Sequence, residues 1–153
     1  MAMANTLRKF LADNGIAYDI VSHPYTMSSR NTATVAKIPA AKIAKPVILE
    51  DDSGYLMAVV PANEHVKIGK LNHVVHRRLG LATEPELKKL FSDCSTGAIP
   101  PLGQAYGMET VVDNQLDDFD DIYFEGGDHK DLVHIKGNSF HKLMRNVRHA
   151  SIC

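Results

Sequence analysis

The sequence predicts one α+β domain, and two kinds of pattern carry this prediction. Two β-favouring runs, Lys45 to Glu50 and Tyr55 to Val60, surround an Asp-Asp-Ser-Gly turn and predict a β-hairpin. Apolar residues at helical spacing before and after the hairpin predict amphipathic helices. Because 153 residues is an ordinary length for one domain, we expect residues 1–153 to fold as a unit.

Further strands are expected where short β-favouring runs end at turn residues. They are Ala17 to His23, Glu109 to Val112, Ile122 to Phe124 and Leu132 to Ile135. Both hairpin arms are nearly continuously apolar, so we place them in the middle of a sheet that is covered on both faces. Gly, Pro and small polar residues between Ser92 and Gly107 predict a long ordered loop, and loops of that length tend to be functional.

Helices are predicted from apolar spacing combined with start and stop signals. They should lie between Thr6 and Gly15, from Ser28 or Ser29 through Val35, from Val66 to Leu79, from Thr83 to Phe91, and from Ser139 to Val147. Thr6 and Ser139 have the side chains of helix N-caps, and Pro85 suits the first turn of the helix that begins near Thr83. Gly15 and Gly80 are expected just after helix ends.

The composition excludes several classes of protein. A formal net charge of −1 argues against wrapping nucleic acid, although it permits gripping one end of it. No run of about 18 apolar residues and no N-terminal signal is present, so we expect a cytoplasmic protein without a membrane partner. Cys94 and Cys153 have neither a disulfide-framework spacing nor a CxxC pattern, so we interpret both as reduced thiols.

Lys45 is the most informative single residue, because lysine is unusual at the head of an apolar strand. A buried ammonium group is costly unless an anion meets it. Pro46 holds Lys45 out of the helical region and fixes the direction in which the strand starts. The simpler interpretation is a strand-end lysine whose ammonium group reaches water, and spacing alone does not decide against it.

The loop Gly97-Ala98-Ile99-Pro100-Pro101-Leu102-Gly103 is the second candidate. Its glycines flank a stiff centre, so backbone N–H groups can approach a ligand closely. Such a loop can bind a carbonyl or phosphate oxygen. A plain connection between a helix and a strand is the alternative.

Other chemistry has weaker support in the sequence. His73 and His76 have a spacing that can hold a metal, but no third ligand stands nearby in a known pattern, so we expect neither metal nor cofactor. Nothing marks an activating neighbour for Cys94. GxSxG, GxxxxGK[ST] and GxGxxG are all absent, so a hydrolase of this sequence would work by positioning and electrostatic stabilisation.

Three segments together resemble a known family: AKIAKPVILEDDSGYLMAVVPAN, the loop GAIPPLG before a strand ending VVD, and IYFEGGD before LVHI. Their order and distances, from about Leu7 to Met144, are similar to those of the YbaK family, free-standing relatives of the prolyl-tRNA synthetase editing domain. The resemblance implies a curved mixed, mostly antiparallel sheet surrounded by helices. It also implies hydrolysis of the ester that joins a wrong amino acid to the 3′ end of a tRNA.

The resemblance also assigns site residues. Lys45 would hold the terminal phosphate or the carbonyl oxygen, while Gly97 and Ala98 would steady the oxygen that gains charge and water or a ribose hydroxyl attacks. The substrate pocket would be lined by Ile99, Pro100, Pro101 and Gly103 and, at its floor, by Gly127, Asp128 and His129. The sequence departs from the family at Pro46 and in the variable turn at Asp128 and His129, which therefore receives no fixed role.

The implied partner is the acceptor end of a mischarged tRNA, and an aminoacyl-tRNA synthetase is a further candidate. We expect Lys37, Lys42 and the basic face of the last helix to hold the tRNA end; that face comprises Lys142, Arg145 and Arg148. Two alternatives stay open: a non-catalytic module that binds tRNA ends or nucleotides, and a metal-dependent hydrolase that uses the histidines. The substrate amino acid and the oligomeric state also stay open.

Overall fold

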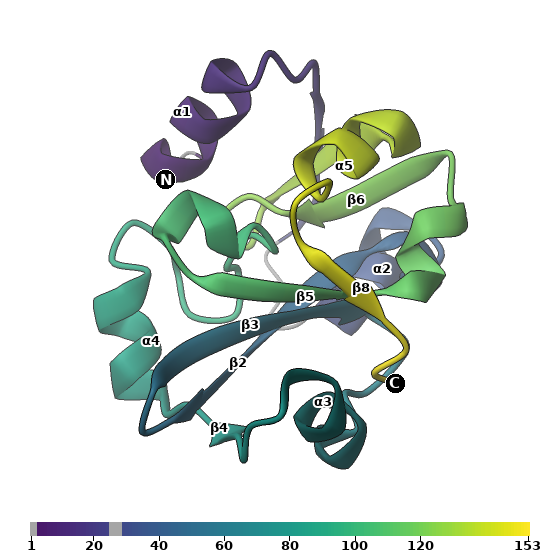
Figure 1. Ribbon diagram of the computed structural model, residues 1–153. Coiled ribbons are helices and arrows are strands. Elements are labelled where there is room, and N and C mark those ends of the chain that lie inside the picture. The colour runs from purple at the N-terminus through teal and green to yellow at the C-terminus, as the bar shows by residue number, and fades with distance from the viewer. Residues whose placement is uncertain (1–2, 25–28) are drawn as a thin grey trace.

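The computed structural model describes residues 3–24 and 29–153, and it shows two sheets with helices around them (Figure 1). One sheet is antiparallel throughout and has the order β1 (Asp19–Ser22), β7 (Asp131–Lys136), β6 (Asp121–Glu125). The other has the order β4 (Gly80–Leu81), β2 (Ala44–Asp51), β3 (Gly54–Pro61), β5 (Glu109–Asp113), β8 (Arg148–Ala150). The predicted α+β class is confirmed.

The second sheet is mixed. β2 pairs antiparallel with β3 and β4, whereas β5 runs parallel to both β3 and β8. A single parallel bridge between Ile43 and Tyr123 links the start of this sheet to the other one. The mixed and mostly antiparallel character is therefore as expected, but the strands divide into two sheets.

The central hairpin forms as predicted. Lys45 pairs with Val60 and Asp51 pairs with Gly54, so β2 and β3 match along their whole length. Gly54 has φ +127, which a residue with a side chain adopts only with strain. The turn residue at this place therefore fixes the register of both strands.

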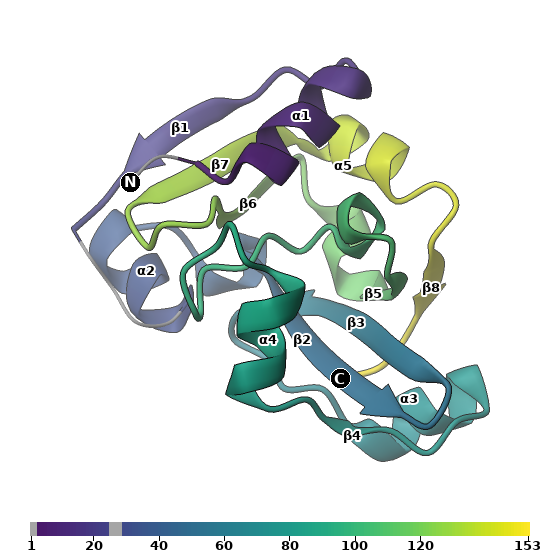
Figure 2. The same ribbon diagram turned by 90° about the vertical axis from the view of Figure 1, so that its left-hand side faces the viewer.

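The helices are short and lie outside the sheets (Figure 2). They are α1 (Asn5–Asp13), α2 (Ser29–Ala36), α3 (Ile68–Val75), α4 (Glu84–Leu90) and α5 (Gly137–Leu143), with 3₁₀ turns η1 (Ala40–Lys42), η2 (Gly103–Tyr106) and η3 (Asn114–Asp118). In Figures 1 and 2, α1 and α5 lie beside the three-stranded sheet, whereas α3 and α4 lie beside β2 and β4.

The predicted start of α4 near Thr83 is confirmed, whereas two predicted N-caps are wrong. In the structure Thr83 and Glu86 form a reciprocal capping box at the start of α4. Thr6 lies inside α1, where its N–H donates to Asp93 Oδ2 at 2.9 Å, a tertiary acceptor that sequence spacing does not reveal. Ser139 lies inside α5, which starts earlier at Gly137. The possible cap Ser28 is outside the described residues.

Two predicted helices end early because the chain turns back to pair as a strand. α3 stops at Val75, His76 adopts the left-handed conformation at φ +55, and the chain then forms β4 beside Leu49. α5 stops at Leu143, and the chain returns as β8 alongside β5. Arg145 and Arg148 therefore do not extend a basic face of the last helix, and that expectation is wrong.

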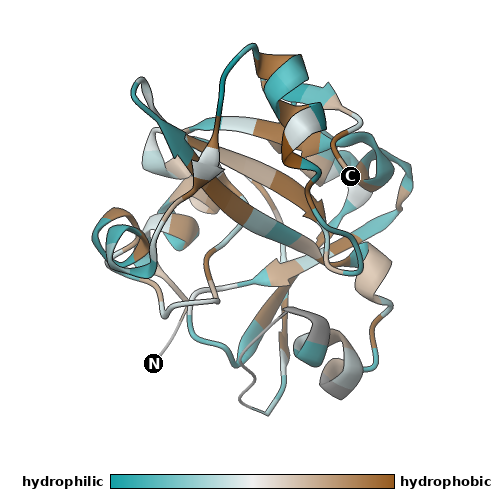
Figure 3. Cartoon of the chain, turned by 90° about the horizontal axis from the view of Figure 1, so that it is seen from below, coloured by the Kyte–Doolittle hydropathy of each residue, from teal (hydrophilic) through white to brown (hydrophobic). Residues whose placement is uncertain are grey.

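Hydrophobic residues are frequent along the central strands (Figure 3), and apolar side chains pack on both faces of the five-stranded sheet. Between the two sheets, the cluster includes Ala44, Ile48, Met57, Val59, Ile99, Leu102, Phe124 and Phe140. On the opposite face, α3 covers a second cluster that includes Leu49, Leu56, Ala58, Val60 and Leu71. The hairpin is thus covered on both sides, as its continuous apolar pattern predicted. Within the described ranges, no helix is long and apolar enough to cross a membrane.

Candidate functional site

The predicted loop Gly97 to Gly103 is anchored by its centre. Ile99 and Leu102 are buried in the core between the sheets, with relative exposures of 6% and 0%. Pro100 and Pro101 are also buried, whereas Gly97 is exposed and has φ +86. The loop therefore has a fixed body and one exposed glycine at its beginning.

The loop and the turn Gly126 to Asp131 are held together, although about thirty residues separate them in the sequence. The N–H of Ser95 donates to Gly127 O at 2.7 Å. His129 Nε2 donates to Thr96 O, because a carbonyl can only accept. The structure thus brings together the two segments that the sequence assigned to the pocket.

The N–H groups of the loop differ in their availability. Ala98 donates to Ser95 O at 3.0 Å and so closes a turn inside the loop. No hydrogen bond between described residues uses the N–H of Gly97 or Ile99. In this arrangement Gly97 and Ile99, rather than Ala98, offer donors to an oxygen atom of a ligand.

Gly103 has a packing role that its place in the loop did not indicate. A Cβ at this position would overlap Thr110 Oγ1 and would come within 3.2 Å of Met57 Cβ. Only glycine therefore lets the end of the loop lie directly on β3 and β5.

The turn itself is built from special backbone conformations. Gly127 has φ +112, and a Cβ there would stand 2.9 Å from Ala4 Cβ. His129 has φ +63 and is only 1% exposed. Asp128 Oδ1 accepts from the N–H groups of Lys130 and Asp131, at 2.9 and 2.8 Å, which closes the turn.

The sequence prediction missed a buried polar group, the carboxyl group of Glu125, directly before this turn. Thr32 Oγ1 donates to Glu125 Oε1 at 2.6 Å, and His23 Nε2 lies 3.7 Å from the same oxygen. The side chains of His23 and Glu125 are 0% and 3% exposed. Burial raises the pKa of Glu125, and the Thr32 hydrogen bond and the nearby His23 oppose that rise. Glu125 ends an apolar strand, the same signal that drew attention to Lys45.

Lys45 lies at the start of β2, two residues after the Ile43–Tyr123 bridge. Since it pairs with Val60, its side chain leaves the sheet on the face of the second apolar cluster, opposite to the face that the loop covers. Its Nζ donates to Ala62 O at 3.4 Å. The charge of Lys45 also acts on the Cys153 thiol. Burial is the larger influence on the pKa of that thiol and raises it to about 12, whereas the charge of Lys45 lowers the pKa. The ammonium group thus lies near the C-terminal segment.

Cys94 is not an activated nucleophile. Its Sγ lies 3.3 Å from Tyr106 Oη and 3.5 Å from Asp93 Oδ1. Burial raises the pKa of the thiol to about 12, so the thiolate is absent at neutral pH.

The histidine pair on α3 does not form a metal site with other side chains. The rings of His73 and His76 are 6.4 Å apart between centroids, and both residues are exposed. In the part of the chain that the structure describes, no group of three or more His, Cys, Asp or Glu side chains could hold a metal ion.

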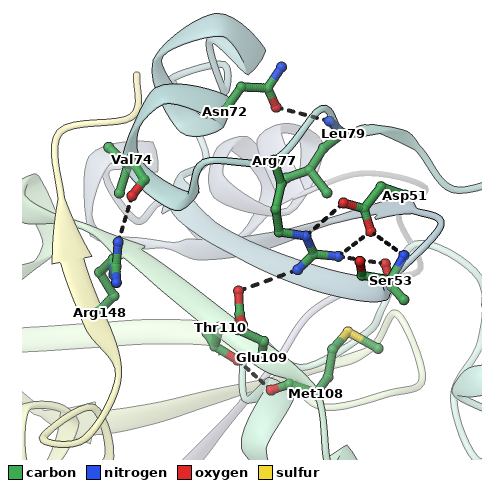
Figure 4. A network of polar contacts seen from close by, with 11 residues as sticks. Asp51, Ser53, Asn72, Val74, Arg77, Leu79, Met108, Glu109, Thr110 and Arg148 are labelled. Carbon is green, nitrogen blue, oxygen red and sulfur yellow. Dashed lines mark hydrogen bonds and ion pairs between the residues drawn. The ribbon is translucent and has the colours of Figure 1, made fainter.

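Two cavities in the described part of the chain are not lined by the predicted catalytic or substrate-binding residues. The first, of about 400 Å³, is lined by Val75, Arg77, Gln104, Met108, Glu109, Thr110, Val111, Asn146, Val147 and Arg148. Its arginines make contacts within the fold (Figure 4): Arg77 binds both Asp51 oxygens and Glu109, and Arg148 donates to Val74 O. The second, of about 530 Å³, is lined by residues of η3 and α5, by Phe119 and Asp120 after η3, and by Lys136 at the end of β7.

The sequence pattern of the aminoacyl-tRNA editing domain matches residues 23–143. The chain belongs to this family. The match includes Lys45, the loop Gly97 to Gly103 and the turn Gly126 to Asp131. No curated protein matches the chain. Membership of the family supports an editing role.

Solved structures share the fold. A candidate trans-editing enzyme for prolyl tRNA synthetase has a TM-score of 0.83 and 19% identity, with 99% of this chain and 98% of that chain covered. The hypothetical protein APE2540 has a TM-score of 0.85 and 18% identity, with 97% and 99% covered. A candidate signal transduction protein from Marinobacter aquaeolei VT8 has a TM-score of 0.80 and 21% identity, and 99% of this chain matches 31% of it. At these identities the likeness establishes the fold alone.

Proposed function

We propose that this protein is a trans-acting aminoacyl-tRNA deacylase that hydrolyses the ester of a mischarged tRNA. The observation that carries the proposal is the junction between the loop and the turn. His129 and Gly127 hold the residues before Gly97, and the N–H groups of Gly97 and Ile99 are left for a ligand oxygen. Donors fixed in this way suit an ester carbonyl oxygen that gains negative charge during hydrolysis.

In the proposed reaction, the oxygen of water attacks the carbonyl carbon of the ester. If the neighbouring ribose hydroxyl attacks first, the amino acid moves to that oxygen, and water then attacks the new ester in the same way. The carbonyl oxygen becomes an oxyanion that Gly97 and Ile99 stabilise by hydrogen bonds. The bond from that carbon to the 3′ oxygen then breaks, and the released ribose oxygen takes a proton. Lys45 leaves the sheet on the face opposite to the loop, so its proposed part is to hold the terminal phosphate of the tRNA end as a point cation. Ala98, Pro100 and Pro101 give the loop its shape.

The inert state of Cys94 supports a mechanism without a covalent intermediate. A thiol with a pKa of about 12 is protonated at neutral pH. Positioning and charge stabilisation would then supply the rate.

We propose that the tRNA acceptor end is the only part of the tRNA that is held, which agrees with a formal net charge of −1. Exposed Lys37 and half-buried Lys42 are candidates to contact it. A single domain of residues 1–153 acting in the cytoplasm, alone or with an aminoacyl-tRNA synthetase, fits this role.

The experiment is a deacylation assay on tRNAs charged with Ala, Ser, Thr, Cys or Pro. We expect turnover of at least one of them, and a loss of at least about tenfold in Lys45→Ala. Lys136→Ala is the matched control, because Lys136 is also a strand-end lysine but is 71% exposed and pairs with Asp121.

Three results would contradict the proposal. Tight binding of uncharged tRNA without turnover of any charged tRNA would favour the binding module. Loss of activity with EDTA would favour the metal-dependent hydrolase. Equal activities of the Lys45→Ala and Lys136→Ala variants would show that Lys45 only snorkels to water.

A further inference from the structure

A buried histidine–glutamate pair joins the end of β6, which leads into the turn, to the residue that follows β1, the neighbour of β7 in the sheet. His23 follows β1 and Glu125 ends β6, and their side chains are 0% and 3% exposed. His23 Nδ1 lies 2.8 Å from Pro24 O. Because a carbonyl oxygen only accepts, Nδ1 carries a proton, and Nε2 is the nitrogen that faces Glu125 Oε1 at 3.7 Å.

This geometry requires a second proton between the two side chains. An unprotonated Nε2 and an ionised carboxylate would each present lone pairs to the other, in a place without water. Thr32 satisfies Oε1 with one hydrogen bond, but Glu125 Oε2 and His23 Nε2 have no hydrogen-bond partner among the described residues. A proton on Glu125 or on Nε2 removes the repulsion.

Among the described residues, the other groups around the pair act in both directions. From the turn, Asp128 raises the pKa of Glu125 and His129 lowers it, while Asp131 lies near His23. Lys130 is exposed. From α2, the described neighbour is the neutral hydroxyl of Thr32. Burial is the largest influence on the pKa of Glu125, and it favours retention of the proton.

The pair is also attached to both ends of the turn through the backbone. Glu125 directly precedes Gly126, and the N–H of His23 donates to Lys130 O at 2.8 Å. One partner is therefore fixed at each end of the turn that carries His129. His129 in turn bonds to Thr96, next to Gly97.

We propose that His23 and Glu125 share one proton at neutral pH and act as positioning residues for the turn Gly126 to Asp131. When this proton is lost at alkaline pH, repulsion separates the strand ends, and the contact between the turn and the loop weakens. The activity consequence rests on the proposed deacylase function, whereas the shared proton can be measured without it.

The activity test uses Glu125→Gln, Glu125→Ala and the control Asp121→Asn. In Glu125→Gln, the new amide side chain can accept from Thr32 and donate a proton to His23 Nε2, so it reproduces the protonated pair without titrating. Asp121 forms a partly exposed pair with His134 between β6 and β7, at 2.7 Å. Folded fractions are matched by circular dichroism before kcat/KM is measured from about pH 6 to 9.

We expect Glu125→Gln to keep at least about a third of the wild-type kcat/KM at pH 7 and to lack the wild-type decline at alkaline pH. Glu125→Ala should lose about tenfold or more, and Asp121→Asn should follow the wild-type profile. A Glu125→Gln variant as inactive as Glu125→Ala, or one with an unchanged alkaline decline, overturns the proposal.

An independent readout is the ¹⁵N chemical shift of the His23 ring. In the wild type, the Nε2 shift should report a shared proton at neutral pH. In Glu125→Gln it should show a neutral ring throughout. If the wild type and Glu125→Gln give the same Nε2 shift, the shared proton is refuted. If no charged tRNA is hydrolysed but the shifts behave as expected, the deacylase function fails and the proton-sharing pair stands.

Discussion

Substituting Gly127 by Ala tests whether the turn beside the predicted loop is built on a backbone that only glycine adopts. Gly127 has φ +112, and its missing Cβ leaves room for Ala4 at the start of α1. Strain of this kind costs about 1–3 kcal/mol. The contacts of a new Cβ with Ala4 Cβ at 2.9 Å and Ala4 N at 3.2 Å add about 1–3 kcal/mol, because α1 must shift.

Gly54→Ala is the matched control for this substitution. Gly54 has a similar φ of +127, but a Cβ there meets nothing within 4 Å. It should therefore suffer the strain alone, about 1–3 kcal/mol. In a chain of this length 1 kcal/mol shifts Tm by about 2–4 °C, so Gly127→Ala should melt several degrees below Gly54→Ala.

The assay is thermal and urea unfolding of both variants by circular dichroism, followed by deacylation at a temperature where both are folded. Gly127→Ala should also lose activity, because the contact of the turn with Ser95 and Thr96 moves with it. Gly54→Ala should keep its activity. If Gly127→Ala is no less stable than Gly54→Ala, the steric argument for the turn is refuted.

Three further outcomes are expected. Cys94→Ser should retain the deacylation rate within about threefold. Alkylation of Cys94 should be slow at neutral pH, because burial raises the pKa of the thiol to about 12. Rapid inactivation by iodoacetamide would contradict the expected slow alkylation. Burial raises the pKa of Asp113, but hydrogen bonds from the N–H groups of Ile152 and Gln115 lower that pKa below its ordinary value. The ionised Asp113 therefore stabilises the fold above about pH 4, and this stabilisation is lost as the pH falls through the folded-state pKa. Asp113→Asn should therefore cost about 1–3 kcal/mol at pH 7, and urea melts should show the difference shrinking in acid. Leu102→Ala should cost about 2–5 kcal/mol in the same melts, because Leu102 is fully buried; a smaller loss would mean that the loop is not part of the core.

Local signals in the sequence were enough to predict the elements whose causes are local. The hairpin follows from two apolar runs and a turn, and the start of α4 follows from Pro85 in its first turn. Elements defined by distant partners were not predictable in this way. β4 and β8 exist because Gly80–Leu81 and Arg148–Ala150 meet strands far away in the sequence, and each shortened a predicted helix.

In the candidate site, too, some parts were indicated by the sequence and others depend on partners that are distant in the sequence. The resemblance to a family indicated the loop and the turn, and the hydrogen bonds of Ser95 and His129 join them. The partners of Glu125 come from the end of β1 and from α2, so no spacing in the sequence could assign them. A charge at the end of an apolar strand was nevertheless visible for Glu125 as for Lys45.

The two charged strand ends differ in what they require of their surroundings. Lys45 is half-buried, and its ammonium group donates to Ala62 O at 3.4 Å. Glu125 is buried inside the fold, so it must be neutral or paired before any substrate arrives. A partly exposed cation is therefore suited to contact substrate, whereas a buried acid is suited to fix the backbone around it. The same sequence signal thus predicts a ligand contact in one case and a positioning residue in the other, and the depth of burial decides between them.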